Sequence, residues 1–297
     1  MEIRDIEIFL TLAEELHFGR TAARLHISTA RVSQAISQQE RRLGSLLFDR
    51  SNRRQVCLTP VGQRLRDDLR LVYAGLRDSL DRARMASRGI TARLRVGLMP
   101  FNVADLQHYW QAFRTRHPHW ELQIRQAPYV GQFDRLRAGD FDVLVVWLPV
   151  EEPDLTVGPV LFTDPRVLAV AAGHELAGRD AVSVEALADF ANAMAPDFPD
   201  YWEDSYLPFH TPGGAGIERP ELVTNAEELI NLVITGEIVH PFPSHVTRHW
   251  SMPHVHFSRI PDMGRLSFAL VWRTEAENDI IRALAHVVRE LGSFTFR

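Results

Sequence analysis

Apolar residues recur at helical spacing in three segments near the start of the chain. A first amphipathic helix is indicated by residues three or four positions apart: Ile6, Phe9, Leu10, Ala13 and Leu16. A second short helix follows over residues 20–25. Ser28 predicts the N-cap of a third helix, because its hydroxyl can accept a free backbone N–H, and Gly44 ends that helix after Leu43. A short helix, a tight turn and a longer helix form a helix-turn-helix.

The third predicted helix has one apolar and one polar side. Val32, Ala35, Ile36 and Leu43 lie along the apolar side, and Ala30, Gln34, Ser37 and Arg41 lie opposite. The polar side suits the major groove of DNA, because Gln can pair with adenine, Ser can donate or accept, and small residues allow close approach to base edges. The alternative is that this third of the chain is a small helical domain whose arginines form a solvated face.

Residues 46–58 predict a β-hairpin, because two short strand-like runs flank a polar tip. Arg50, Arg53 and Arg54 at this hairpin would face phosphates or a minor groove, which gives affinity but little sequence information. Cys57 lies in one of the runs and has no second cysteine to pair with. We therefore expect it to pack in the core rather than act as a redox switch.

A long helix is predicted from Thr59 to about Ser87, with Thr59 as the cap and Pro60 in the first turn. Its apolar seam consists of Val61, Leu65, Leu69, Val72, Leu76 and Leu80. A small domain cannot bury so long a seam, so pairing with a second copy is expected. Packing on the chain's own downstream domain remains the alternative.

The remaining two-thirds alternate short apolar runs with amphipathic segments. Strands at 94–99, 122–126 and 142–147, separated by helices at 103–117 and 131–138, predict a βαβαβ unit whose ligands would lie beyond the carboxyl ends of the strands. A second α/β unit starts near Phe162, and its predicted elements include a helix at 184–190 and a strand at 237–239. We expect an α/β protein overall, with residues 1–58 as an all-α winged domain, 59–88 as a linker helix and 89–297 as two lobes. Lobe I would hold about 91–161 and 266–297, and lobe II about 162–265.

Charge is distributed unevenly between these parts. Of 297 residues, the first 95 carry 18 Arg against 11 Asp plus Glu, a net charge of +7, whereas the remainder carries 15 against 27, a net charge of −12. The asymmetry indicates that the N-terminal part approaches a polyanion. No basic leader and no run of roughly 20 apolar residues is present, so we expect a cytoplasmic protein without membrane contact.

Several residues of the first third together match a known pattern. They are Ala22-Ala23, Leu25, Ser28, Ser33, Ile36, Leu43-Gly44, Leu47-Phe48, Arg50, Arg53-Arg54 and Leu58-Thr59-Pro60-Val61-Gly62. With them, the run from Phe18 to Leu65 resembles the winged helix-turn-helix of LysR-type transcriptional regulators. The resemblance implies that Thr29, Ala30, Ser33 and Gln34 lie near bases, that Ser28, Arg31, Arg53, Arg54 and Thr59 lie near the DNA backbone, and that the long helix dimerises. The family often has Pro where this chain has Ala30.

The two predicted lobes resemble the periplasmic-binding-protein-like (type 2) effector domain of the same family. Ala138-Gly139-Asp140-Phe141-Asp142 and Val233-Ile234-Thr235-Gly236 carry this likeness. Where the family commonly has Ser or Thr after the first strand, this chain has Met99, Phe101 and Asn102. We expect a small, partly apolar or aromatic effector, bound by Phe101, Asn102, Trp147, Phe198, Thr224, Asn225 and Phe242, with the helix start at Asn225 favouring a negative or carbonyl group. The alternative is that several of these aromatic residues belong to the ordinary core.

Other constellations do not indicate enzyme chemistry. His245 and His249 have the spacing of two helical metal ligands but lack the Glu that zinc hydrolases place between them, and the glycine-rich 211–216 lacks the Lys and Ser or Thr of a phosphate loop. We expect no cofactor, no metal and no catalysis. The expected partners are an inverted-repeat DNA site, a small effector, a second or further copies of the chain, and RNA polymerase. A solute-binding protein or an α/β enzyme with a helical appendage remains the alternative.

Overall fold

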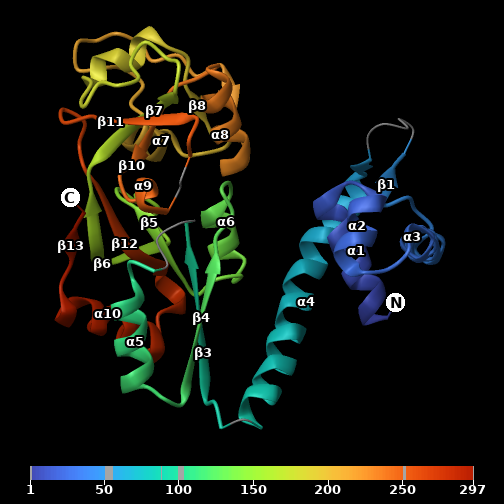
Figure 1. Ribbon diagram of the computed structural model, residues 1–297. Coiled ribbons are helices and arrows are strands. Elements are labelled where there is room, and N and C mark those ends of the chain that lie inside the picture. The colour runs from blue at the N-terminus through green and yellow to red at the C-terminus, as the bar shows by residue number, and fades with distance from the viewer. Residues whose placement is uncertain (1, 51–55, 88, 100–103, 250–251, 297) are drawn as a thin grey trace. The chain divides into compact units, whose positions relative to one another are not determined.

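The computed structural model describes residues 2–50, 56–87, 89–99, 104–249 and 252–296. The chain forms two compact units, Met1–Arg88 and Gly89–Arg297 (Figure 1). Each unit is described by itself.

Three helices enclose the core of the first unit: α1 (Ile3–Glu15), α2 (Phe18–Leu25) and α3 (Thr29–Leu43). Ile8, Phe9 and Ile36 are fully buried in this core. The predicted start of α3 is confirmed, because the Ser28 Oγ accepts a hydrogen bond from the Arg31 backbone N–H at 3.2 Å. Its predicted end is confirmed as well, because Gly44 takes a left-handed conformation with φ 69°.

A short hairpin and a long helix complete this unit. β1 (Phe48–Asp49) pairs antiparallel with β2 (Cys57–Leu58), and α4 (Pro60–Ala86) follows with Thr59 as its cap, as predicted. The expected burial of Cys57 is wrong, because the side chain is exposed. Cys57 is paired with the exposed Asp49, whereas Leu58 is paired with the buried Phe48, so the two residues of β2 face opposite sides.

The second unit contains a six-stranded sheet in the order β13-β6-β12-β5-β3-β4. β3 (Ala92–Leu98) lies parallel to β4 (Trp120–Gln126) and β5 (Val143–Trp147), which confirms the predicted βαβαβ unit. The chain returns through β12 (Leu266–Arg273), which lies antiparallel to β5 and β6 (Leu155–Asp164), while β13 (Phe294–Thr295) extends the edge beside β6. α5 (Gln107–Arg116) and α10 (Asp279–Leu291) pack on each other and on the sheet, and α6 (Gln132–Arg137) contacts β5 and β12.

Lobe II is built on a three-stranded antiparallel sheet in the order β10-β7-β11. Its elements are β7 (Arg166–Ala171), η1 (Val184–Asp189), β8 (Ala193–Met194), α7 (Asp200–Tyr206), β9 (Glu221–Leu222), α8 (Ala226–Thr235), β10 (His240–Pro243), α9 (Val246–His249) and β11 (Val255–Arg259). The helix predicted at 184–190 is a 3-10 helix, and the strand predicted at 237–239 lies at 240–243 instead. No helix in the described parts of the chain is both long and apolar enough to cross a bilayer.

Candidate functional site

The polar side of α3 is open to solvent. Ser28, Thr29, Ala30 and Gln34 are exposed, while Arg31, Ser33 and Ser37 are half-buried. Val32, Ala35 and Ile36 on the opposite side are fully buried, which fixes the rotation of the helix. The helix therefore presents an amide, hydroxyls and a methyl group on a rigid support, the groups that can read base edges.

Two arginines near this face already have partners within the unit. The Arg31 Nη2 lies 3.4 Å from the Asp5 Oδ1. The Arg50 Nη2 donates to the Glu40 Oε2 at 2.9 Å, and the Arg50 guanidinium lies 5.2 Å from the centre of the Phe18 ring. Arg53 and Arg54, the other predicted phosphate contacts of the wing, lie outside the described residues.

Glu40 is a residue that the sequence analysis missed. Its buried carboxylate accepts hydrogen bonds from the backbone N–H groups of Leu47 at 3.0 Å and Phe48 at 3.3 Å, besides its bond to Arg50. The carboxylate thus connects α3 to the first strand of the wing. Its position in the sequence could have indicated a buried carboxylate, because Glu40 follows Ile36 by one helical turn and so lies on the apolar side of the helix.

The start of α4 lies against the same wing. The Thr59 Oγ1 accepts from the Gly62 N–H at 3.0 Å and donates to the Leu46 carbonyl at 2.7 Å. A Cβ on Gly62 would come within 2.1 Å of the Leu47 carbonyl oxygen, so only glycine allows this approach. These contacts set the geometry between the wing and the linker helix.

The apolar seam of α4 divides into two parts. Leu65 and Leu69 pack against the hydrophobic cluster of the first unit. Val61, Val72 and Leu80 are 45%, 66% and 48% exposed, and Leu76 is half-buried. The exposed Val72 and Leu80 therefore lie beyond Leu65 and Leu69, the seam residues that pack on this unit's core.

In the second unit, the predicted effector residues do not form one group. Trp147 and Phe198 lie together, with ring centres 6.0 Å apart, but Phe242 is buried in the separate core of lobe II. Thr224 and Asn225 are exposed at the start of α8. Phe101 and Asn102 lie outside the described residues.

Trp147, the last residue of β5, stacks on Trp202 of α7. The ring centres are 3.8 Å apart and the planes differ by 2°. The Trp202 Nε1–H donates to the Trp147 carbonyl at 3.0 Å, and the Trp147 Nε1–H faces the Trp202 carbonyl at 3.4 Å. The sequence analysis missed Trp202, although it lies in an aromatic-rich stretch with Phe198, Tyr201 and Tyr206.

A buried polar group lies behind this stack. The fully buried Arg166 donates from Nη2 to the carbonyls of Tyr206 at 2.7 Å and Pro241 at 3.1 Å, and its guanidinium lies 4.5 Å from the centre of the Tyr206 ring. Burial lowers the pKa of Arg166 to about 10 and raises that of Tyr206 to about 12. Burial, helped by the charge of Arg166, lowers the pKa of His240 to about 3.

The helix start at Asn225 is occupied by groups of the chain itself. The Asn225 Oδ1 accepts from the Glu228 N–H at 2.8 Å, and the Glu228 carboxylate accepts from the Thr224 N–H at 3.0 Å. Asn225 lines a cavity of about 350 Å³ with Glu227, Glu228 and Glu237 among its other lining residues. These carboxylates disfavour the negative ligand group that the sequence suggested for this terminus.

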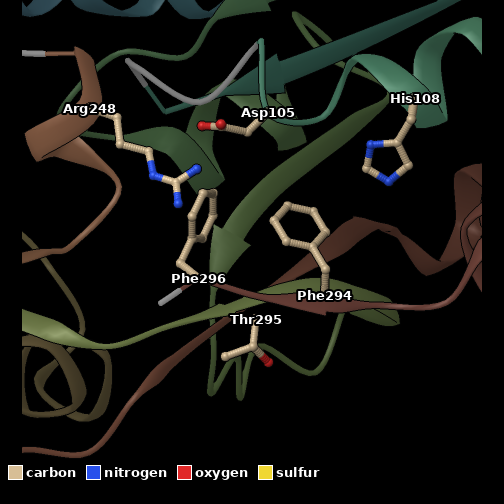
Figure 2. A pocket seen from close by; sticks show the side chains of 6 residues that line it. All are labelled: Asp105, His108, Arg248, Phe294, Thr295 and Phe296. Carbon is tan, nitrogen blue, oxygen red and sulfur yellow. The ribbon is translucent and has the colours of Figure 1, made fainter.

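A second cavity, of about 330 Å³, lies between the start of α5, α9 and β13; Figure 2 shows the side chains that line it. Its lining residues are Asp105, His108, Arg248, Phe294, Thr295 and Phe296. The Arg248 guanidinium lies 5.0 Å from the centre of the Phe296 ring. None of the predicted effector residues that the structure describes lines this cavity.

The two histidines with metal-ligand spacing face separate carboxylates. The buried His245 Nδ1 lies 2.5 Å from the Asp164 Oδ2, and the His249 Nε2 lies 2.8 Å from the Asp105 Oδ2. Among the residues that the structure describes, no group of three or more His, Cys, Asp or Glu side chains could hold a metal ion.

Comparison with protein families gives two matches. The family model of the bacterial regulatory helix-turn-helix protein, lysR family, matches residues 3–63, and that of the LysR substrate binding domain matches residues 87–293.

Similar proteins match over nearly the full length. The HTH-type transcriptional regulator TfdS of Cupriavidus pinatubonensis is 30% identical over 97% of this chain and 98% of its own length. AlsR of Bacillus subtilis, also an HTH-type transcriptional regulator, is 24% identical over 97% and 95%. The crystal structure of CbnR, a LysR family transcriptional regulator, has a TM-score of 0.66 at 22% identity and covers 98% of this chain and 99% of its own. CbnR in complex with its target DNA has a TM-score of 0.63 at 22% identity and covers 98% and 100%.

Proposed function

Because this chain belongs to the LysR family of DNA-binding transcription regulators with an effector-binding domain, we propose that two copies bind an inverted-repeat site through α3 and that a small effector in the second unit controls this binding. The role is regulation of transcription rather than catalysis, because the matched relatives are regulators. RNA polymerase is the further partner that such a role requires.

The exposed polar side of α3 is the observation that carries this proposal. Gln34 can pair bidentately with an adenine, and the small Thr29 and Ala30 at the helix start let the backbone approach base edges. Ser28 caps the helix, whose free N–H groups and positive dipole end then favour a phosphate. CbnR, which shares the fold, binds its target DNA as a full-length chain.

A second copy is needed because one recognition helix covers only a few base pairs. The exposed Val72 and Leu80 of α4 supply an apolar surface for pairing with the same helix of another copy. A two-fold axis between the copies would place two α3 helices on the two halves of an inverted repeat.

The test uses the purified full-length chain and fragments of the host genome. Fragments that remain bound should share an inverted repeat, and Gln34→Ala should lower affinity for that site by about 5- to 150-fold, the value of one bidentate base contact (about 1–3 kcal/mol). Gln107→Ala, an equally exposed change on α5, is the matched control and should leave affinity unchanged. Binding without sequence preference, or equal effects of both changes, would contradict base reading by α3.

A further inference from the structure

The indole of Trp202 fills the place, at the end of β5, where a ligand site is expected in this fold. Ligands of parallel sheets bind beyond the carboxyl ends of the strands. Trp147 is the residue at that end of β5, and Trp202 from lobe II covers its ring. Both side chains are almost completely buried, with 3% and 1% exposed.

We propose that Trp202 is a built-in occupant of the effector cleft, and that the effector is a planar aromatic compound with a hydrogen-bond donor on its ring edge that displaces this indole and stacks on Trp147. The inference rests on the proposed function, because it names the effector class for the regulated site.

The surroundings of Trp202 define this chemical class. Its ring lies among aromatic rings: the Trp147 ring is stacked on it at 3.8 Å between ring centres, and the Phe133 and Phe198 rings are tilted against it at 4.6 Å and 4.9 Å. The Trp202 Nε1–H donates a hydrogen bond to the Trp147 carbonyl at 3.0 Å. A ligand that replaced the indole without a donor would leave this buried carbonyl unpaired, which costs binding free energy. The replacement must therefore be flat, aromatic and able to donate.

The segment that carries Trp202 is suited to moving. α7 has only seven residues, and the structure shows no side-chain hydrogen bond at its N-cap, Pro199. Three residues before the helix, Asp197 has a left-handed backbone conformation with φ 62°, which Gly, Asn and Asp adopt more readily than other residues and which is typical of a turn. A short helix without a side-chain cap opens at lower cost than a long capped helix.

A movement of α7 would disturb hydrogen bonds at the connection between the lobes. The carbonyl of Tyr206, the last residue of α7, accepts from the buried Arg166, which begins β7 directly after the chain leaves the six-stranded sheet. The hydroxyl of Tyr201 donates to Glu152 of lobe I at 3.0 Å. Displacement of Trp202 would strain or break both bonds, so occupancy of the cleft would alter how the lobes are held.

The experiment uses the full-length chain labelled with 5-fluorotryptophan and follows the tryptophan resonances by 19F NMR. Trp147→Phe, Trp202→Phe and Trp272→Phe assign three signals, and Trp272 in β12 serves as the control outside the stack. Indole is the probe, and benzofuran, which has the same shape but no N–H, is the matched control compound. We expect indole to move the Trp202 signal to that of a solvent-exposed residue and leave the Trp272 signal in place. Benzofuran should bind at least tenfold more weakly.

Removing the occupant should strengthen binding. A site that must first open has its affinity reduced by the fraction of open molecules. Trp202→Ala should therefore bind indole at least tenfold more tightly than the wild type. If this variant does not fold, Trp202→Phe, which keeps a ring but loses the N–H, should still bind more tightly than the wild type.

Two results would overturn the inference: an unchanged Trp202 signal at saturating indole, or equal binding of indole and benzofuran. Operator binding without any probe is measured on the same samples. If the operator is bound but neither compound displaces Trp202, the built-in occupant is refuted while the proposed function stands. If no DNA is bound, the proposed function fails independently of the probes.

Discussion

Truncation of Glu40 to alanine would remove the carboxylate that joins α3 to the wing. Three hydrogen bonds are lost, from the backbone N–H groups of Leu47 and Phe48 and from Arg50. A buried N–H left without an acceptor costs about 1–3 kcal/mol, and a half-exposed ion pair contributes about 0.2–1 kcal/mol. We therefore expect Glu40→Ala to lower the free energy of unfolding of the first unit by about 2–7 kcal/mol.

The tryptophans allow the two units to be followed separately. All of them lie in the second unit, since the first in the sequence is Trp110. The full-length chain is unfolded in urea at a fixed protein concentration. Glu40→Ala should shift the unfolding of the first unit, followed by far-UV circular dichroism, to a lower urea concentration, and it should leave the tryptophan fluorescence transition of the second unit unchanged.

Two further variants separate the contributions of the carboxylate. Arg50→Ala removes the ion pair with Glu40 and the contact of the guanidinium with the Phe18 ring, and it keeps both backbone hydrogen bonds to the carboxylate. It should therefore cost no more than about 2 kcal/mol of stability. Glu40→Gln keeps one acceptor oxygen and should fall between the other two variants. If Glu40→Ala were as stable as the wild type and bound the operator equally well, the carboxylate would not hold the wing, and this reasoning would be refuted.

Three other changes have definite expected outcomes. Gly62→Ala should reduce operator affinity more than tenfold, because its Cβ would meet the Leu47 carbonyl at 2.1 Å and push the wing from α4; a gel-shift titration measures this. Val72→Asp, at a 66% exposed position, should shift the chain from dimer to monomer in sedimentation without lowering the helix content, and an unchanged mass would exclude this surface. Because burial lowers the pKa of His240 to about 3, the folded state binds its proton less readily than the unfolded chain. The contribution of the neutral His240 to stability should be fully present above about pH 6.5, and the free energy of unfolding should fall by about 1.4 kcal/mol per pH unit between there and pH 3. In urea unfolding at a series of pH values, His240→Phe should reduce this slope by the amount that one proton contributes.

Local signals account for the parts of the fold that could be predicted. The bounds of α3 follow from Ser28, whose hydroxyl caps the helix, and from Gly44, which accepts a left-handed conformation. Such signals act within a few residues, so they can be recognised in a single sequence. The start of α4 at Thr59-Pro60 was predicted on the same ground.

Residues whose environment comes from distant segments were harder to predict. Cys57 lies in an apolar run, but its exposure depends on which residue of β1 it is paired with. Trp202 and Trp147 are 55 positions apart, and nothing in either local pattern indicates that their rings stack. Hydrophobic periodicity identifies the buried side of an element without identifying the element that covers it.

Buried charge shows the same limit and links both units to their function. Glu40 lies on the apolar side of α3, where a carboxylate would be costly unless hydrogen bonds satisfied it, and the hairpin and Arg50 supply them. The Arg166 Nη2 likewise donates to carbonyls of two elements, α7 and β10, while its buried Nε has no hydrogen-bond partner among the described residues. Glu40 thus joins the hairpin to α3, and Arg166 joins α7 and β10 to the start of β7. Because a lost partner at such a position leaves a buried charge or a buried N–H unpaired, the bonds of Glu40 fix the geometry that a DNA reader requires, whereas the bond of Arg166 to Tyr206 sets the free-energy cost of moving α7.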